Sequence, residues 1–327
     1  MSPQKLFAGL TGPGHRRALG RAITLVESSR PEDRAAAAEL MALTEQHPPP
    51  QTTFRLGISG TPGVGKSTFI ESFGLELIRR SHRLAVLAID PTSSLSGGSI
   101  LGDKTRMERL TREEAVYIRP SPNAGELGGV GPASRAAVRL CEAAGYDYVI
   151  VETVGVGQAE WQVHSMTDAF LLLGQPASGD DLQGIKRGIL ELADHLVVNK
   201  ADRLPKDARL AAAELRRSLH LAPPRPDGWT VEVATASALT GAGVPEVADR
   251  MELYRTQQYP YIQRRRQEQR LMWLREQLRR ELLRRLDGYL TEAGLENDQL
   301  RALLDQHTTI PATTDVILAD FYQNSNS

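Results

Sequence analysis

The clearest chemistry in the sequence lies in a glycine-rich segment, Gly60–Ser67, which reads Gly-Thr-Pro-Gly-Val-Gly-Lys-Ser. It follows an apolar run at 55–59 and precedes an amphipathic stretch, so its context is a strand, a loop and a helix. Backbone N–H groups of such a loop point inward at a phosphate chain, and the helix N-terminus adds partial positive charge. The pattern therefore predicts a nucleotide-binding loop. Its predicted members are Gly60, Thr61, Pro62, Gly63, Val64, Gly65, Lys66, Ser67 and Thr68.

Two side chains of this loop and three carboxylates elsewhere have the chemistry to act on phosphates. Lys66 is placed to neutralise the β- and γ-phosphates, so we predict a catalytic role for it. The Ser67 hydroxyl is placed to ligate Mg²⁺, which prefers hard oxygen ligands. Asp90 and Glu152 each end an apolar run, and ligands gather at the carboxyl ends of strands in open α/β sheets. Together with Asp103, in a glycine-containing segment between them, they are the predicted metal-binding carboxylates.

A second motif, Asn199-Lys-Ala-Asp202, follows an apolar run and indicates which base is bound. The Asp202 carboxylate can accept two hydrogen bonds from the ring N–H and exocyclic amino group of guanine, whereas adenine has no such donor pair. Asn199 is expected to tie this loop to the phosphate loop, and the Lys200 stem to cover the base. The Ala238 amide is the expected donor to the guanine carbonyl oxygen, so GTP and GDP are the predicted ligands. The predicted base-binding residues are Asn199, Lys200, Asp202, Ser237, Ala238 and Leu239.

The segment that begins at Glu152 predicts a switch that responds to the terminal phosphate. Glu152-Thr-Val-Gly155 stands where Ras-like GTPases carry Asp-x-x-Gly, so the Gly155 amide is expected to sense the γ-phosphate and 155–160 to change conformation. Gln158 is a candidate for orienting the attacking water, because no glutamine stands in the Ras position. Lys186, or a group from a partner, is a candidate to complete the site. This arrangement predicts a slow intrinsic GTPase that a partner accelerates.

Short apolar runs alternate with helical stretches between residues 54 and 250 and position these motifs. Several runs are apolar throughout, which is typical of strands buried on both faces of a parallel sheet. The alternation predicts an α/β fold: a P-loop NTPase with a mostly parallel central sheet flanked by helices. The predicted strands are 55–59, 84–89, 116–119, 148–152, 169–173, 195–198 and 230–234.

The sequence divides into three predicted parts. A helical N-terminal extension covers 1–50, a GTPase domain covers 51–252, and an arginine-rich helical region covers 253–327. In the last part leucines recur at spacings of three or four and give one apolar stripe, which predicts a helix that packs or dimerises. The stripe consists of Leu271, Leu274, Leu278, Leu282, Leu286 and Leu290.

Composition restricts the class of protein. The 327 residues carry 39 Lys and Arg against 40 Asp and Glu, a formal net charge of −1, which argues against a general nucleic-acid binder. The single cysteine, Cys141, excludes an internal disulfide and a thiolate metal cage and fits a reducing cytosol. The sequence shows no signal-peptide pattern and no apolar run of the ~18 residues that a membrane span needs. We therefore expect a cytoplasmic protein that binds neither nucleic acid nor a membrane.

Taken together, the motifs resemble those of the MeaB/ArgK/MMAA family of P-loop GTPases. The resemblance covers roughly residues 15–250 and is most specific at 97–107, Gly-Gly-Ser-Ile-Leu-Gly-Asp-Lys-Thr-Arg-Met, and at 152–158, Glu-Thr-Val-Gly-Val-Gly-Gln. It implies a GTPase chaperone that gates adenosylcobalamin loading on methylmalonyl-CoA mutase, or a related acyl-CoA mutase, and protects or reactivates that enzyme. It also implies a homodimer, a switch at 97–107 and a third switch at 179–188, and it agrees with the three predicted metal-binding carboxylates.

The sequence departs from the family pattern at two places. Ala159 stands where the family usually carries serine, and the stretch 173–178, Leu-Gly-Gln-Pro-Ala-Ser, is unusual before the third switch. Neither departure touches the predicted phosphate or base contacts.

Three other functions stay open on the sequence alone. One is a nucleotide-dependent kinase linked to amino-acid transport, against which the guanine-selecting Asp202 and the lack of an evident acceptor site both count. Another is a GTP-gated metal-delivery protein, which would need clusters of cysteine and histidine rather than one cysteine and scattered histidines. The third is a scaffold that binds GTP without turnover.

Overall fold

The structure is a computed structural model and describes residues 2–28, 30–47, 53–90, 107–122, 131–153, 159–176, 187–220, 223, 225–295, 297–307 and 309–324. The chain forms two compact units, Met1–Arg265 and Arg266–Ser327. The division between them coincides with neither predicted boundary, after residue 50 or after residue 252. The three-part division of the chain stays a prediction.

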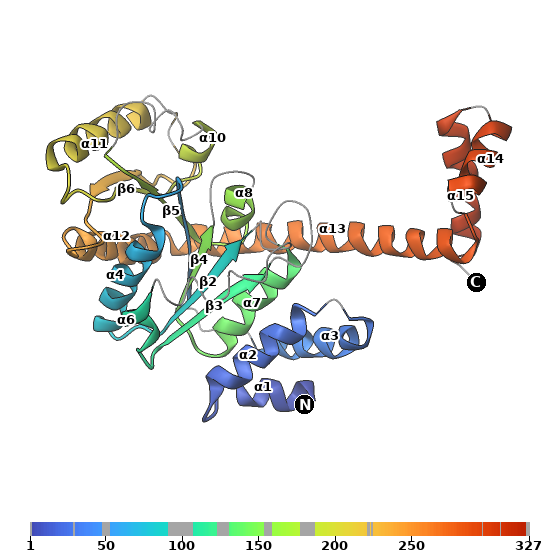
Figure 1. Cartoon of the computed structure of the whole chain (residues 1–327), viewed down its shortest axis with the longest axis horizontal. Coiled ribbons are helices and arrows are strands. Elements are labelled where there is room, and N and C mark those ends of the chain that lie inside the picture. Colours follow the sequence, from blue (N-terminus) through green and yellow to red (C-terminus); the bar gives the residue numbers. More distant parts are fainter. Residues whose placement is uncertain are drawn as a thin grey trace. The chain divides into compact units, whose positions relative to one another are not determined.

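Helices and strands alternate through most of the first unit, whereas the described part of the second unit is helical (Figure 1). The strands are β1 (Phe54–Gly60), β2 (Leu84–Asp90), β3 (Val116–Pro122), β4 (Tyr148–Thr153), β5 (Ala169–Gly174), β6 (His195–Val198) and β7 (Glu232–Thr235). The helices up to the middle of the chain are α1 (Pro3–Gly9), α2 (His15–Val26), α3 (Pro31–Gln46), α4 (Lys66–Arg79), α6 (Glu108–Thr111), α7 (Pro132–Ala143) and α8 (Ala159–His164). The later helices are α10 (Arg187–Leu190), α11 (Pro205–His220), α12 (Val244–Gln257), α13 (Tyr259–Glu292), α14 (Asn297–His307) and α15 (Ile310–Asn324).

The seven strands of the described residues form one sheet in the order β3-β2-β4-β1-β5-β6-β7, and every neighbouring pair is parallel. β1 lies in the middle, between β4 and β5. Because parallel strands end at the same edge of a sheet, the segments that follow β1, β4, β5 and β6 meet there. The predicted α/β fold with a parallel sheet is confirmed, and every predicted strand is present with its ends shifted by three residues at most.

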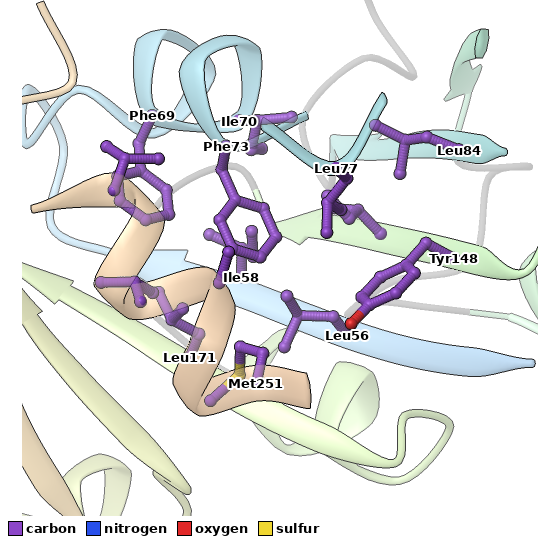
Figure 2. Packing of buried hydrophobic residues seen from close by; sticks show 14 of the residues in the cluster. Leu56, Ile58, Phe69, Ile70, Phe73, Leu77, Leu84, Tyr148, Leu171 and Met251 are labelled. Atoms are coloured by element: carbon purple, nitrogen blue, oxygen red, sulfur yellow. The ribbon is translucent and has the colours of Figure 1, made fainter. Parts of the chain in front are cut away.

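One face of the sheet packs against α4 and α12 (Figure 2). Successive side chains of a strand point to opposite faces, so Leu56 and Ile58 of β1 lie on the same face. They pack in one buried cluster with Phe69 and Phe73 of α4 and with Met251 of α12. Full burial of each such side chain contributes about 1.5–3 kcal/mol. This cluster therefore fixes α4 firmly behind the loop that joins it to β1.

The opposite face packs against α7 and α8. Arg55 of β1 points to this face, where its Nε and Nη2 donate to the two carboxylate oxygens of Glu142, in α7, over 2.7 and 2.9 Å. Such a buried bidentate pair fixes the position of α7 more than it adds to stability. At Gly57 a Cβ atom would lie 2.8 Å from Cγ1 of Val163, in α8. The missing side chain thus allows α8 to approach the strand backbone closely.

The N-terminal helices lie against the β3 edge of the sheet. Arg119 of β3 forms an ion pair with Glu27 over 2.5 Å, and Arg16 of α2 donates to the backbone carbonyls of Glu113 and Val116. α2 therefore covers the edge strand, whose unpaired backbone groups are a site for unwanted association in many proteins.

The described part of the second unit contains the C-terminal part of α13 together with α14 and α15. The predicted leucine stripe lies on α13, where the side chains of Leu271, Leu274, Leu278 and Leu282 are between 50% and 61% exposed. α14 and α15 pack on each other. Among the described residues, no helix combines the length and the apolar character needed to cross a membrane.

Candidate nucleotide-binding site

The loop between β1 and α4 is shaped by glycines. Gly63 and Gly65 have φ angles of +78° and +91°, in the left-handed region that residues with a side chain rarely adopt. A Cβ atom at Gly65 would also lie 3.0 Å from Nδ2 of Asn199. A Cβ atom at Gly60 would lie 2.5 Å from the backbone carbonyl oxygen of Leu173, in β5. At these positions no side chain covers the loop backbone. The loop leads into the N-terminus of α4, where the first N–H groups have no hydrogen-bond partners within the helix.

Lys66, the first residue of α4, lies over this loop. Its Nζ donates to the backbone carbonyls of Gly60, over 2.8 Å, and Thr61, over 3.3 Å. Burial lowers the pKa of the ammonium group, and the negative charges of Glu152 and Glu160 act in the opposite direction. The ammonium is thus held at the loop by backbone oxygens, close to two carboxylates.

Hydroxyl and carboxylate groups meet at the ends of β1 and β4. Ser67 Oγ donates to Oε1 of Glu152 over 3.3 Å, and Glu152 is only 4% exposed. One residue further along, Thr153 Oγ1 donates to Ser59 Oγ over 2.7 Å, and both residues are fully buried. The oxygens of Ser67 and Glu152 are hard donors, and their short separation suits a small cation such as Mg²⁺. Asp90 ends β2, which pairs with β4, so its backbone lies at the same edge of the sheet.

Asn199, directly after β6, joins three loops. Its Nδ2 donates to the backbone carbonyl of Val64, in the phosphate loop, over 2.9 Å. Its Oδ1 accepts from the backbone N–H of Ala238, after β7, over 3.0 Å. Its own N–H donates to the carbonyl of Gly174, at the end of β5, over 2.8 Å. Asn199 therefore holds the two loops predicted to recognise the base against the loop predicted to bind the phosphates.

The neighbouring residues of this motif differ in their surroundings. Lys200 adopts φ +59°, and its Nζ donates to the carbonyl of Gly63 over 2.5 Å and to Oε1 of Gln175 over 3.4 Å. Asp202 is exposed to solvent. A carboxylate that binds a guanine base has to be accessible in this way. Leu239, predicted to lie near the base, is 76% exposed.

The loop after β7 is held by its own backbone. Ser237 is buried, its N–H donates to the carbonyl of Ala242 over 2.8 Å, and its Oγ accepts from the N–H of Thr240 over 3.2 Å. The N–H of Ala238, predicted to donate to a guanine carbonyl, donates here to Asn199. A bond to the base at this position thus requires the Ala238 N–H to be shared between two acceptors.

The remaining predicted site residues lie outside the described part of the chain. They are Asp103, Gly155, Gln158 and Lys186, and the side chain of Asp90 is likewise not described. The same holds for residues 97–106 of the first predicted switch, 155–158 of the second and 179–186 of the third.

The structure adds two residues that the sequence reasoning did not assign to the site, Ser59 and Gln175, and gives a contact for a third. Glu160, the last residue of the predicted second switch, is fully buried on α8 and its charge acts on Lys66. Ser59 follows the last paired residue of β1 in its register with β4 and accepts a hydrogen bond from Thr153, and the predicted strand ends did not indicate this register. Gln175 contacts the Lys200 ammonium and belongs to the stretch after β5 that departs from the family pattern.

Comparison with known proteins identifies a family that this chain matches over most of its length. The family model described as Methylmalonyl Co-A mutase-associated GTPase MeaB matches residues 19–290 of this chain. This span includes the phosphate loop, both base-recognition loops and most of α13.

Individual relatives agree with this match. A probable GTPase of Mycobacterium tuberculosis is 55% identical over 243 residues, which are 74% of this chain and 72% of the relative. The GTPase ArgK of Escherichia coli is 46% identical over 276 residues, 84% of this chain and 83% of the relative. The mitochondrial methylmalonic aciduria type A homolog of Mus musculus is 46% identical over 283 residues, 83% of this chain and 68% of the relative.

One solved structure resembles nearly the whole chain. Its title reads "Crystal structure of LAO/AO transport system kinase", and the similarity covers 99% of this chain and 98% of that chain. The TM-score is 0.72 at 33% sequence identity.

Proposed function

Since the chain belongs to the MeaB family of methylmalonyl-CoA mutase-associated GTPases, we propose that it uses the γ-phosphate of GTP to gate adenosylcobalamin loading on that mutase. Family membership confirms the predicted resemblance and the predicted enzyme class, a GTP hydrolase that binds guanine nucleotide. The proposal adds that the protein protects or reactivates the mutase and that its hydrolysis is slow without this partner. A cytoplasmic location, predicted from the sequence, belongs to the same proposal.

The observation that carries the proposal is the position of Asn199. Its side chain bonds to Val64 on one side and to Ala238 on the other, so the phosphate loop and the base-recognition loops form one frame. Each of these buried hydrogen bonds contributes about 0.5–1.5 kcal/mol. A frame that reads the base and the phosphates together supports recognition of GTP as a whole.

In the proposed hydrolysis, a water attacks the γ-phosphorus in line with the departing GDP. Lys66 stabilises the negative charge that develops on the phosphate oxygens, together with the N–H groups at the start of α4. The predicted role of Gln158 is to orient the water. Lys186 or a partner group completes the site, which is the reason to expect partner stimulation.

Magnesium belongs to the same proposal. When bound, Mg²⁺ neutralises charge on the β- and γ-phosphates. Ser67 and Glu152 would hold it, because their oxygens lie 3.3 Å apart at the end of β4. Asp90 and Asp103 are the other predicted ligands.

A homodimer is the proposed assembly. The second unit carries an exposed stripe of leucines on one long helix, an apolar surface that a second copy of the same helix can cover. The oligomeric state is measured directly by light scattering of the full chain.

The function is tested by phosphate release from GTP, measured alone and with purified methylmalonyl-CoA mutase. We expect the mutase to raise the rate at least ~10-fold, since groups supplied by a partner increase GTPase rates by large factors. Serum albumin at the same concentration is the control. A rate unchanged by the mutase, with no complex on a sizing column, would contradict the proposal.

A second candidate function is favoured by one specific similarity. The solved structure that covers 99% of this chain is titled as a transport system kinase, so a phosphotransferase linked to amino-acid transport stays a candidate. The test is transfer of labelled γ-phosphate from GTP to a periplasmic amino-acid-binding protein, with Lys66→Ala as the control. Label on the acceptor that Lys66→Ala abolishes would favour this candidate over the mutase-linked function.

A further inference from the structure

Arg265 lies on α13, at the end of the first unit, and is nearly buried, with a side chain 8% exposed. Its Nη2 donates to the backbone carbonyl of His164 over 3.0 Å, and its Nη1 to that of Asp168 over 3.3 Å. His164 is the last residue of α8. The guanidinium therefore satisfies a carbonyl at a helix C-terminus, where a positive charge also complements the helix dipole.

The other end of α8 carries Glu160. This side chain, in the first turn, is fully buried, and its negative charge acts on the ammonium of Lys66. α8 has six residues, a length of ~9 Å, so less than two turns of helix separate Glu160 from the carbonyl that Arg265 contacts. The predicted second switch, 155–160, runs into its first turn.

The packing around α8 leaves it little freedom at its C-terminal end. Val163 lies so close to β1 that a Cβ atom at Gly57 would come within 2.8 Å of it. Asp168, just beyond α8, forms two hydrogen bonds with the backbone of Arg55, in β1. The Asp168 N–H donates to the Arg55 carbonyl, and the Asp168 Oδ2 accepts from the Arg55 N–H, each over 2.8 Å. The C-terminal end of α8 is thus fixed, and the N-terminal end carries the Glu160 charge that acts on Lys66.

We propose that Arg265 is a positioning residue for GTP hydrolysis, which acts by anchoring the C-terminal end of α8 to α13. The fixed end makes the first turn of α8, with Glu160, adopt one position relative to Lys66, and hydrolysis depends on that position. The inference rests on the GTPase activity and not on the mutase as partner.

Asp194, the carboxylate next to Arg265, keeps other partners when the Arg265 side chain is removed. Asp194 is fully buried, and one of its oxygens lies 3.6 Å from Arg265 Nη1. Its other oxygen accepts from Arg225 over 2.6 Å and from the Tyr254 hydroxyl over 3.3 Å. A variant without the Arg265 guanidinium therefore keeps a charged partner for Asp194, and we expect it to fold.

The test compares Arg265→Met with Arg264→Met. Arg264 is the adjacent, exposed arginine, and its guanidinium lies over the Tyr261 ring, away from α8. We expect kcat for GTP hydrolysis to fall about 5- to 20-fold in Arg265→Met only. The dissociation constant of GDP should stay unchanged within ~2-fold, because within the described part of the chain the hydrogen bonds of Arg265 go to His164 and Asp168 and not to the predicted nucleotide-binding loops. Arg265→Lys keeps the charge but replaces the two separate nitrogens of the guanidinium by one, which fits the two carbonyl positions less well, so its kcat should lie between the two.

Hydrogen exchange of the α8 amides is the second measurement, and it should be faster in Arg265→Met than in Arg264→Met. A kcat equal to that of Arg264→Met would overturn the proposal, as would a loss of GDP affinity by the same factor as kcat. If Arg265→Met does not fold, Arg265→Lys decides: a lower kcat with unchanged GDP binding supports the anchor, and wild-type kcat overturns it. Absence of GTP turnover in the wild-type chain would instead contradict the proposed function.

Discussion

The side-chain amide of Asn199 donates to the backbone carbonyl of Val64 over 2.9 Å, across 135 positions of the sequence. The bond crosses from the end of β6 to the phosphate loop after β1. Since the same side chain accepts from the Ala238 N–H, it joins the loop predicted to bind the phosphates to a loop predicted to recognise the base.

Replacement of Asn199 by aspartate should weaken GTP and GDP binding by the same factor, about 10- to 100-fold. The carboxylate still accepts from Ala238 but turns an oxygen without a proton toward the Val64 carbonyl. Titration calorimetry measures both affinities. Asn297→Asp, at an exposed position on α14, is the matched control, and an affinity equal to that control would refute the role of the bridge.

The Asp202→Asn variant should prefer xanthine over guanine nucleotides. An amide donates where the carboxylate accepted, so it suits the carbonyl oxygen of xanthine, and we expect the affinity ratio of XTP to GTP to rise at least ~10-fold. Competition binding measures this ratio. Asp207→Asn, an exposed carboxylate on α11, should leave it unchanged, and an unchanged ratio in Asp202→Asn would refute the base assignment.

Lys66→Ala should reduce GTP hydrolysis at least ~100-fold, because the ammonium predicted to neutralise the phosphate oxygens is lost. Phosphate release under single-turnover conditions separates this effect from slow product release. Lys206→Ala, in the first turn of α11, is exposed and should hydrolyse GTP as the wild type does. Turnover that persists in Lys66→Ala would exclude the lysine from the chemistry.

The stability of the first unit should fall as the pH drops from 6.5 toward 4. His195 of β6 is 1% exposed, and among the described residues neither ring nitrogen has a hydrogen-bond partner. Burial, with a smaller contribution from the charge of Arg250, lowers the pKa of His195 from 6.5 to about 4. Between these values the unfolded chain binds more protons than the folded one, so acid favours unfolding by up to ~1.4 kcal/mol per pH unit.

Urea unfolding at pH 7, 6 and 5 measures this dependence. His195→Leu should reduce it, whereas His220→Leu, at an exposed position, should not. Burial lowers the pKa of His164 to about 3, so His164 contributes with the same sign in all variants. An equal pH dependence in His195→Leu and wild type would contradict the assignment.

The sheet was predictable because its signal is local. β1, β4 and β5 are apolar over most of their length, and this pattern requires burial on both faces whatever the rest of the chain does. The phosphate loop was predictable for a related reason, since the positive φ angles of Gly63 and Gly65 demand glycine at fixed positions.

Contacts that charged side chains make with residues far away in the sequence were not predictable in this way. Arg265 and His164 are 101 positions apart, and nothing in a pattern of exposed and buried residues indicates which carbonyl a buried arginine reaches. Arg264 and Arg266 stand on either side of Arg265, so the local sequence does not indicate that Arg265 is the buried one. Arg225 and Asp194 form an ion pair across 31 positions, and the local pattern does not indicate this pair either.

The central position of β1 affects which parts of the protein can respond to a bound nucleotide. Its two neighbours, β4 and β5, carry the chain away on opposite flanks of the phosphate loop, at Thr153 and at Gly174. We therefore expect two separate segments to respond to GTP, one after β4 and one after β5. A substitution that abolishes one response should leave the other intact, so a variant that does not respond to the nucleotide at all should need changes on both sides of β1.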